Sequence, residues 1–362
     1  MAWQEVVGHE AQIDRFRRNL RSGRLASAFL FVGPDGIGKQ LFARKLTQTL
    51  FCEVNPEYEC NPCGQCPVCL QVIKGTHPDL HYVELLPGTA EIRTAQIVGG
   101  AIRINDKEEQ FPGVCYEVNL KPIRARRKVV IINDADSLNN TSTANLLKTL
   151  EEPPPGAVMI LLGTSLSQQL DTIISRCQIL SFNALLPEQI QQILLQQQVV
   201  DDPNEALELA MIANGSVGLA RRYSESDLLE TRRELLGLLT ALPQQAEKLS
   251  AMVIGLVDGK SLSRREKMDQ LDFLTSIVVT CFHQVALQLS GQPPSGDPVL
   301  IDVSRQIASA WPGDVETALA CIDRTLETAY HGRANANVKT LVEVWVDDLS
   351  QIWLTGGFKL PT

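Results

Sequence analysis

The sequence lacks a long apolar run. None reaches 18 consecutive residues, so no segment is predicted to span a membrane. It also lacks an excess of positive charge, because 33 Lys and Arg stand against 42 Asp and Glu and leave a net charge of −9. Such an acidic chain is a poor candidate for gripping DNA unaided. The first residues, MAWQEVVGHE, have neither the basic nor the apolar region of a signal peptide, so we expect a cytoplasmic protein.

Disulfides are not expected in a reducing compartment, so the nine cysteines need another explanation. Five of them fall between Cys52 and Cys69, and such clustering favours a metal site. The others are scattered along the chain, and we expect each to be a small buried residue: Cys115, Cys177, Cys281 and Cys321.

Short apolar runs alternate with amphipathic segments over residues 1–183. The runs are 27–32, 80–85, 128–133, 157–163 and 177–182, and the clearest helical segments are 39–51 and 141–152. This alternation predicts an α/β fold with a largely parallel sheet covered on both faces.

Beyond residue 183 the strand signal fades. Residues 184–225 are predicted to form a short helical unit, and residues 226–362 an all-helical part with a surface loop at 290–298. A chain of 362 residues is long enough for two or three such domains.

The stretch GPDGIGKQ, residues 33–40, follows an apolar run and precedes a helical segment. In this context Gly33, Gly36 and Gly38 let backbone N–H groups turn toward a phosphate, and Lys39 pairs with its outer oxygens. The motif ordinarily ends in Ser or Thr, whose hydroxyl holds the magnesium ion. Here that position is Gln40.

A second departure follows the run 128–133. ATP hydrolysis needs an aspartate at the end of a second strand to help hold magnesium, followed by an acidic residue. The sequence has Asn133 and Asp134 at these positions. We therefore expect slow or no hydrolysis of ATP, while binding of ATP or ADP stays open. Thr164, which follows the run 157–163, is a further candidate nucleotide contact.

The clustered cysteines have metal-ligand spacing. Cys60, Cys63, Cys66 and Cys69 follow one another at intervals that leave two residues between, and this spacing lets one tight turn present two sulfurs to zinc. With Cys52 there are five cysteines for four positions, so one is spare. The cluster lies on an excursion between two core elements, which favours a structural zinc over a catalytic one.

Several motifs resemble bacterial DNA polymerase III clamp-loader subunits. They are the segment 6–39, the cysteine cluster, GTHPD (75–79), NLLKTLEEPP (145–154) and ISRC (174–177). Within that family the chain is most similar to the delta prime subunits, strongly over residues 5–225 and more faintly at RANANVKTLVEVW (333–345). The resemblance implies an AAA+ α/β domain at 1–183 with a zinc module at about 52–75, a helical lid at 184–225 and a helical collar domain at 226–362.

The resemblance also implies a role. Such subunits form a five-membered ring with the gamma/tau motors and delta, and the ring places the sliding clamp on primed DNA. It implies that Arg176 acts as an arginine finger at a neighbour's ATP, whereas outside this motif it would be a surface arginine paired with a carboxylate. The family's zinc pattern implies Cys52, Cys63, Cys66 and Cys69 as ligands, with Cys60 as an alternate.

The competing hypothesis is a gamma/tau-like subunit that itself binds and hydrolyses ATP. A motor should carry a hydroxyl at 40, a carboxylate at 133 and a lid arginine at 218, but this chain has Gly218, with Arg221 and Arg222 displaced. A zinc-dependent DNA-binding factor is a third hypothesis, which the acidic charge disfavours.

Two basic stretches, 15–24 and 121–128, fit DNA phosphates, an acidic partner or solvated faces. Residues 100–123 are longer than the family leads us to expect, and the sequence assigns them no role.

Overall fold

The computed structural model describes residues 3–86, 89, 91–104, 107–225, 227–259, 262, 264–333 and 337–355. Within the segment 333–345, residues 334–336 therefore lie outside the described residues. The chain divides into two compact units, Met1–Arg221 and Arg222–Thr362.

The first unit is built on a parallel sheet. All five apolar runs form its strands, as predicted: β1 Ala28–Val32, β2 Leu80–Val83, β5 Lys128–Ile132, β6 Ala157–Gly163 and β7 Gln178–Ser181. Their order is β2-β5-β6-β1-β7, and every pairing is parallel. In this register Val32 at the end of β1 lies opposite Gly163 at the end of β6. Residues that follow these strands therefore meet at one edge of the sheet.

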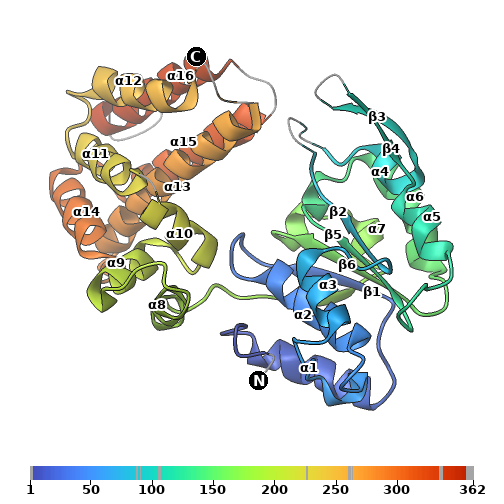
Figure 1. Cartoon of the computed structure of the whole chain (residues 1–362). Helices are drawn as coiled ribbons and strands as arrows, with labels where there is room; N and C mark the ends of the chain where they lie inside the picture. The colour runs from blue at the N-terminus through green and yellow to red at the C-terminus, as the bar shows by residue number, and fades with distance from the viewer. Residues whose placement is uncertain are drawn as a thin grey trace. The chain divides into compact units, whose positions relative to one another are not determined.

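Helices cover both faces of the sheet (Figure 1). One face packs against α1 Glu10–Arg21, α2 Lys39–Phe51 and α3 Pro67–Lys74, and the other against α4 Thr94–Val98, α5 Val114–Asn119, α6 Asn140–Glu151 and α7 Asp171–Ile174. Alternate residues of one strand serve the two cores: Phe29 and Phe31 contribute to the first, Leu30 and Val32 to the second. This alternation explains why the central strands are apolar throughout.

An antiparallel hairpin that the sequence analysis did not predict lies within residues 100–123. Strands β3 Gly100–Ile104 and β4 Lys107–Phe111 pair only with each other among the described residues. Both are largely exposed, so they show no apolar run. Gly99 and Gly113 close the hairpin's base, where a Cβ on Gly113 would lie 2.1 Å from the Gly99 nitrogen. Both have positive φ, which favours glycine.

Three short helices complete the first unit and enter the second: α8 Pro187–Gln196, α9 Pro203–Ile212 and α10 Val217–Glu225. The boundary at residue 183 between the sheet and these helices stays a prediction. The helical character predicted for 184–225 is confirmed.

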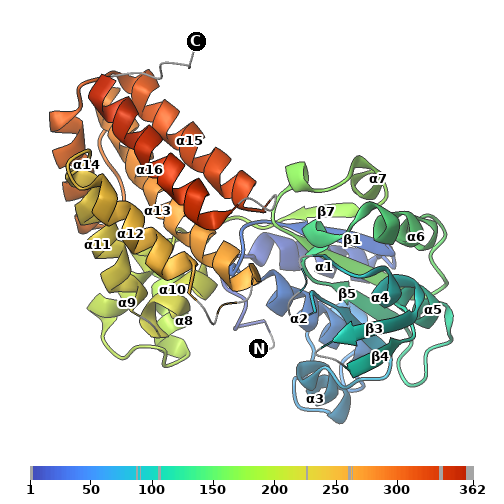
Figure 2. The same ribbon diagram turned by 90° about the horizontal axis from the view of Figure 1, so that it is seen from above.

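Every regular element among the described residues of the second unit is a helix, as predicted, and the predicted loop at 290–298 separates two of them. Its helices are α11 Leu228–Thr240, α12 Ala246–Val257, α13 Arg264–Leu289, α14 Pro298–Ala310, α15 Val315–Arg333 and α16 Val338–Thr355. Figure 2 shows α15 and α16 lying alongside α13 and α12. Among the described residues α13 alone has the length and composition to cross a membrane, over Glu266–Leu289. Of its most apolar stretch 61% is buried, as in the core helix of a helical bundle.

Two buried polar contacts join helices of this unit. Asp297 caps α14 by accepting the Leu300 N–H at 3.2 Å, and it also pairs with Arg232 of α11 at 2.5 Å. Both charged side chains are almost fully buried, so loss of either would leave an uncompensated charge. Trp345 of α16 is fully buried and donates to the Thr325 hydroxyl of α15 at 3.1 Å.

Asp79 fixes the chain between α5 and β5. Its fully buried carboxylate accepts three backbone N–H groups, from Ile123 at 2.6 Å and from Arg124 and Ala125 at 2.8 Å each. Burial acts to raise the pKa of Asp79, but the three N–H donors outweigh it and lower that pKa below its ordinary value of 3.8. The charge of Asp79 therefore stabilises the folded chain.

Replacing Asp79 with Asn should reduce the free energy of unfolding by about 2–3 kcal/mol at pH 7, because the three donors lose a charged acceptor. The charge contributes fully above pH 3.8, and its contribution is lost as the pH falls through the lowered pKa of the folded state. Urea unfolding of both proteins across this range should show their difference shrinking in acid. Exposed Asp201→Asn is the control, and an equal loss in that variant would contradict the assignment.

Candidate functional site

A cavity of about 530 Å³ opens at the carboxyl-terminal edge of the sheet. Its walls come from the loop after β1, from residues 133–136 after β5, from residues 163–164 at the end of β6, and from α8 and α10. Open α/β sheets bind ligands at this edge, and the volume suits a nucleotide. All of the predicted nucleotide contacts except Gly33 line the cavity: Gly36, Gly38, Lys39, Gln40, Asn133, Asp134 and Thr164.

The phosphate-binding loop, residues 33–40, has the backbone shape of its motif. Gly36 and Gly38 adopt φ of +75° and +102°, and α2 begins directly after Gly38. The ammonium of Lys39 is buried and donates to the carbonyls of Gly33 at 2.5 Å and Pro34 at 2.8 Å. Burial lowers the pKa of Lys39, although nearby carboxylates, Asp35 first, oppose this. Gly33 thus contributes to the loop through its carbonyl.

Gln40 and Asn133 both face this cavity, where the motif would supply the two protein contacts to magnesium. Gln40 is exposed, and an amide replaces the hydroxyl. The Asn133 side-chain oxygen is buried and has no protein hydrogen-bond partner. A neutral amide oxygen attracts a divalent cation less than a carboxylate does, so the residues present fit a bound nucleotide better than a catalytic magnesium ion.

Thr164 is held by a residue that the sequence analysis missed. Its backbone N–H and its hydroxyl both donate to one carboxylate oxygen of Asp136, each at 2.7 Å. The other oxygen of Asp136 accepts from the side-chain amide of Gln169. Asp136 lines the cavity and is the third residue after the apolar run 128–133, but that position carries no motif of its own.

The helix α10 packs directly on the phosphate-binding loop. The Gly218 N–H donates to the Gly36 carbonyl at 3.1 Å, and a Cβ on Gly218 would lie 3.0 Å from the Gly36 Cα. Residue 218, where a lid arginine would be expected in a motor subunit, therefore contacts the phosphate-binding loop through its backbone. One turn further along, Arg221 lines the cavity and donates to Gln197, the residue that follows α8.

His9 is a second residue that the sequence analysis did not single out. It is 1% exposed, lines the cavity and makes a 2.8 Å hydrogen bond from Nε2 to the Ile37 carbonyl. Because a carbonyl only accepts, Nε2 carries the proton, and Nδ1 stays buried without a protein partner. His9 thereby ties the start of α1 to the phosphate-binding loop.

Arg176 follows α7 and does not line the cavity. Its guanidinium contacts the Glu151 carboxylate at the end of α6, at 2.7 Å from Nε and 2.5 Å from the terminal nitrogen Nη2. Arg176 thus makes the carboxylate pair that was expected of it if it were only a surface arginine. The other terminal nitrogen donates to the Thr172 carbonyl and the Ser175 hydroxyl.

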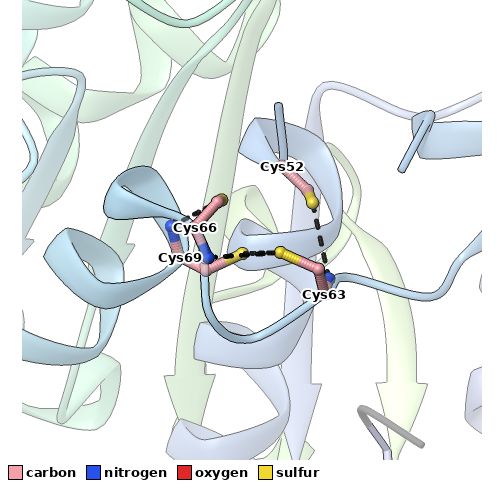
Figure 3. A group of neighbouring side chains, drawn as sticks. All are labelled: Cys52, Cys63, Cys66 and Cys69. Carbon is pink, nitrogen blue, oxygen red and sulfur yellow. Dashed lines mark hydrogen bonds between the residues drawn. The ribbon is translucent and has the colours of Figure 1, made fainter. Parts of the chain in front are cut away.

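The structure gathers Cys52, Cys63, Cys66 and Cys69, whose sulfurs all lie within 4.8 Å of one another (Figure 3). Four sulfurs around one zinc at about 2.3 Å would lie about 3.8 Å apart, so the cluster fits a metal ion. Backbone N–H groups donate to the sulfurs of Cys52, Cys63 and Cys66 at 3.3–3.4 Å. The chain reaches this geometry because Cys52 directly follows α2 and Cys66 caps α3.

Cys60 lies outside this cluster. Its side chain is buried in the apolar core, and its carbonyl accepts from the Trp3 indole at 2.8 Å. Burial raises the pKa of the Cys60 thiol to about 11. In contrast, burial acts to raise the pKa of Cys52, but N–H donors led by Asn55 outweigh it and lower that pKa to about 7.

Comparison with known proteins agrees with this geometry. A family model described as "DNA polymerase III, delta subunit" matches residues 8–186. The DNA polymerase III subunit delta' of Bacillus subtilis is 31% identical over 246 residues, which cover 68% of each chain. The subunit delta' of Pseudomonas aeruginosa is 33% identical over 61% of this chain and 62% of that protein. This chain belongs to the DNA polymerase III delta prime family.

Tau subunits are relatives too. The subunit tau of Escherichia coli is 32% identical over 73% of this chain, but the match spans only 37% of tau. Over the matched stretches the chain thus shares about a third of its residues with a delta prime subunit and with tau alike. Whether the chain has the residues for ATP hydrolysis depends instead on the lining of the cavity. The relevant positions are Gln40, Asn133 and Gly218.

In the second basic stretch, 121–128, three of the charged side chains are engaged within the chain. Arg124 pairs with Glu53 at 2.9 Å, Arg127 pairs with Glu57 at 3.0 Å, and the ammonium of Lys128 is buried. The pairs involving Arg124 and Arg127 join the strand approach to the cysteine module. These pairs weaken the alternative in which the stretch 121–128 meets DNA phosphates.

Replacing Cys52 with Ala should reduce bound metal from about one ion per chain to near zero, because it removes one of four ligands. Replacing Cys60 with Ala should leave the metal content unchanged, since its thiol lies outside the cluster. Elemental analysis of the purified variants, with circular dichroism to verify folding, checks both outcomes. Loss of metal in the folded Cys60→Ala variant would overturn the ligand set.

Proposed function

We propose that this chain is the stator of a DNA polymerase III clamp loader, which assists ATP hydrolysis at a neighbouring subunit and hydrolyses little or none itself. The observation that carries the proposal is the pair Gln40 and Asn133 in a cavity that otherwise keeps the phosphate-binding loop. Membership of the delta prime family supports it.

Catalysis of phosphoryl transfer is largely positioning and charge stabilisation, with magnesium bridging the outer phosphates. Loss of a single well-placed electrostatic contact commonly costs about 100- to 1,000-fold in rate. Two magnesium contacts are replaced here, and Gly218 removes a lid arginine besides. Lys39 still offers a positive charge, so ATP or ADP can bind, with magnesium held weakly or not at all.

Arg176 is the residue we assign to the neighbour's site. A guanidinium is permanently charged and can clasp a phosphate with two donors. A finger supplied in trans is worth about 10³–10⁵ in rate. In support, Arg176 lies on the surface of the first unit, in ISRC, with its side chain about one-third exposed.

The partners follow from this role. We propose that the chain assembles with gamma/tau and delta subunits in the cytoplasm, and reaches the sliding clamp and primer–template DNA through that complex. The proposed division is an AAA+ α/β domain at 1–183, a lid at 184–225 and a collar at 226–362, with the collar as the oligomerisation domain.

We further propose that the cysteine cluster holds a structural zinc. A site with four thiolates is closed, because no coordination position remains for water or substrate. The metal would stabilise the excursion between α2 and β2, because the free energy of metal binding adds to that of folding.

The alternative is a gamma/tau-like motor. Similarity to tau and the retained Lys39 favour it, whereas the amides at positions 40 and 133 oppose it. The isolated chain should hydrolyse ATP at least about 100-fold more slowly than the assembled loader.

Restoring the motif with Gln40→Thr and Asn133→Asp should give the isolated chain magnesium-dependent affinity for ATP, because it returns two ligands to the ion. Calorimetric titration with and without magnesium checks this, and Lys39→Ala added to the double variant should abolish the gain. Rapid magnesium-dependent phosphate release by the unaltered isolated chain would favour the motor instead.

Replacing Arg176 with Ala should leave the chain folded but lower the DNA-stimulated ATPase of the assembled loader, because one neighbouring site loses its finger. Arg176→Lys should restore little of the activity, since an ammonium lacks the planar fork. Steady-state turnover of loaders built with each variant is the measurement. Unchanged turnover with Arg176→Ala would remove the proposed role.

A further inference from the structure

The guanidinium of Arg176 is already occupied within its own chain. Of its five N–H groups, two point to Glu151 and two to the Thr172 carbonyl and the Ser175 hydroxyl. A phosphate clasped by two donors therefore requires at least one of these contacts to be given up.

The three partners differ in kind. Thr172 and Ser175 belong to the turn that carries Arg176 itself, so they move with it. Glu151 comes from α6, 25 residues away in the chain, and it alone of the three is charged. A phosphate that approached Arg176 while the carboxylate stayed in place would meet a like charge. Glu151 is therefore the contact that a phosphate must displace.

We propose that Glu151 competes with the neighbour's phosphate for Arg176 and so restrains the arginine finger until that nucleotide is in place. The proposal rests on the proposed function, since it needs Arg176 to serve a neighbour's ATP. The restraint is a simple exchange of one anion for another at the same N–H donors.

The exposure of the pair sets the size of this effect. The side chains of Arg176 and Glu151 are 32% and 49% exposed, and ion pairs this exposed are weak. An outer phosphate carries more negative charge than a carboxylate and can displace it. We therefore expect removal of the Glu151 charge to raise turnover by roughly two- to fivefold, which is the size of a weak ion pair. A much stronger pair between Glu151 and Arg176 would keep the arginine from reaching the neighbour's phosphate at all.

The test uses the assembled loader with clamp and primed DNA and measures kcat and KM for ATP. Glu151→Gln should raise kcat roughly two- to fivefold and leave KM nearly unchanged, because a finger acts on the transition state. Glu152→Gln is the matched control: it removes the same charge from the adjacent exposed position, which makes no hydrogen bond or ion pair with Arg176 among the described side chains. It should leave kcat unchanged.

The double variant Glu151→Gln/Arg176→Ala should turn over at the rate of Arg176→Ala alone, because Glu151 acts only through Arg176. A fall in kcat with Glu151→Gln, or no change, would overturn the restraint, and so would a double variant that differs from Arg176→Ala. If Arg176→Ala itself leaves turnover unchanged, the proposed finger role is wrong. If Arg176→Ala lowers turnover but Glu151→Gln does not change it, only the restraint by Glu151 is wrong.

Discussion

Two amide side chains, Gln40 and Asn133, limit the chemistry available in the cavity at the sheet edge. The loop around it keeps its glycines, its buried Lys39 and the helix that begins behind it, so the site retains the means to attract a phosphate. What it lacks is the hydroxyl and carboxylate that fix a divalent cation on that phosphate. We propose that this loop, without a fixed cation, binds a nucleotide but promotes little chemistry, and that the chain acts in hydrolysis through a residue outside its own cavity.

Much of this could be predicted from the sequence, because the decisive signals are local. Each buried strand of the sheet is a continuous apolar run, and the phosphate-binding loop is a short motif. The cysteine spacing predicted a metal site, but it left open whether Cys52 or Cys60 belongs to it. The alternation of Phe29 and Phe31 with Leu30 and Val32 between two cores follows from strand geometry alone.

The remaining features depend on contacts between distant segments, which leave no periodic signal. The β3–β4 hairpin is exposed and polar, so nothing marks it as strand. Asp136 becomes part of the site only because β5 and β6 are neighbours and bring Thr164 within reach. The pairing of Arg176 with Glu151 likewise depends on how α6 and α7 meet, and it is the observation behind the proposed competition for Arg176.

The most direct test is the structure of the assembled loader trapped with ADP and aluminium fluoride, which mimics the phosphoryl group in transfer. We expect the Arg176 guanidinium to lie on the neighbour's fluoride group and away from Glu151. We also expect no magnesium ion between Gln40 and Asn133, whatever nucleotide this chain holds. A magnesium-bound transition-state complex in this chain's own cavity, with Arg176 still paired to Glu151, would contradict the proposed division of labour.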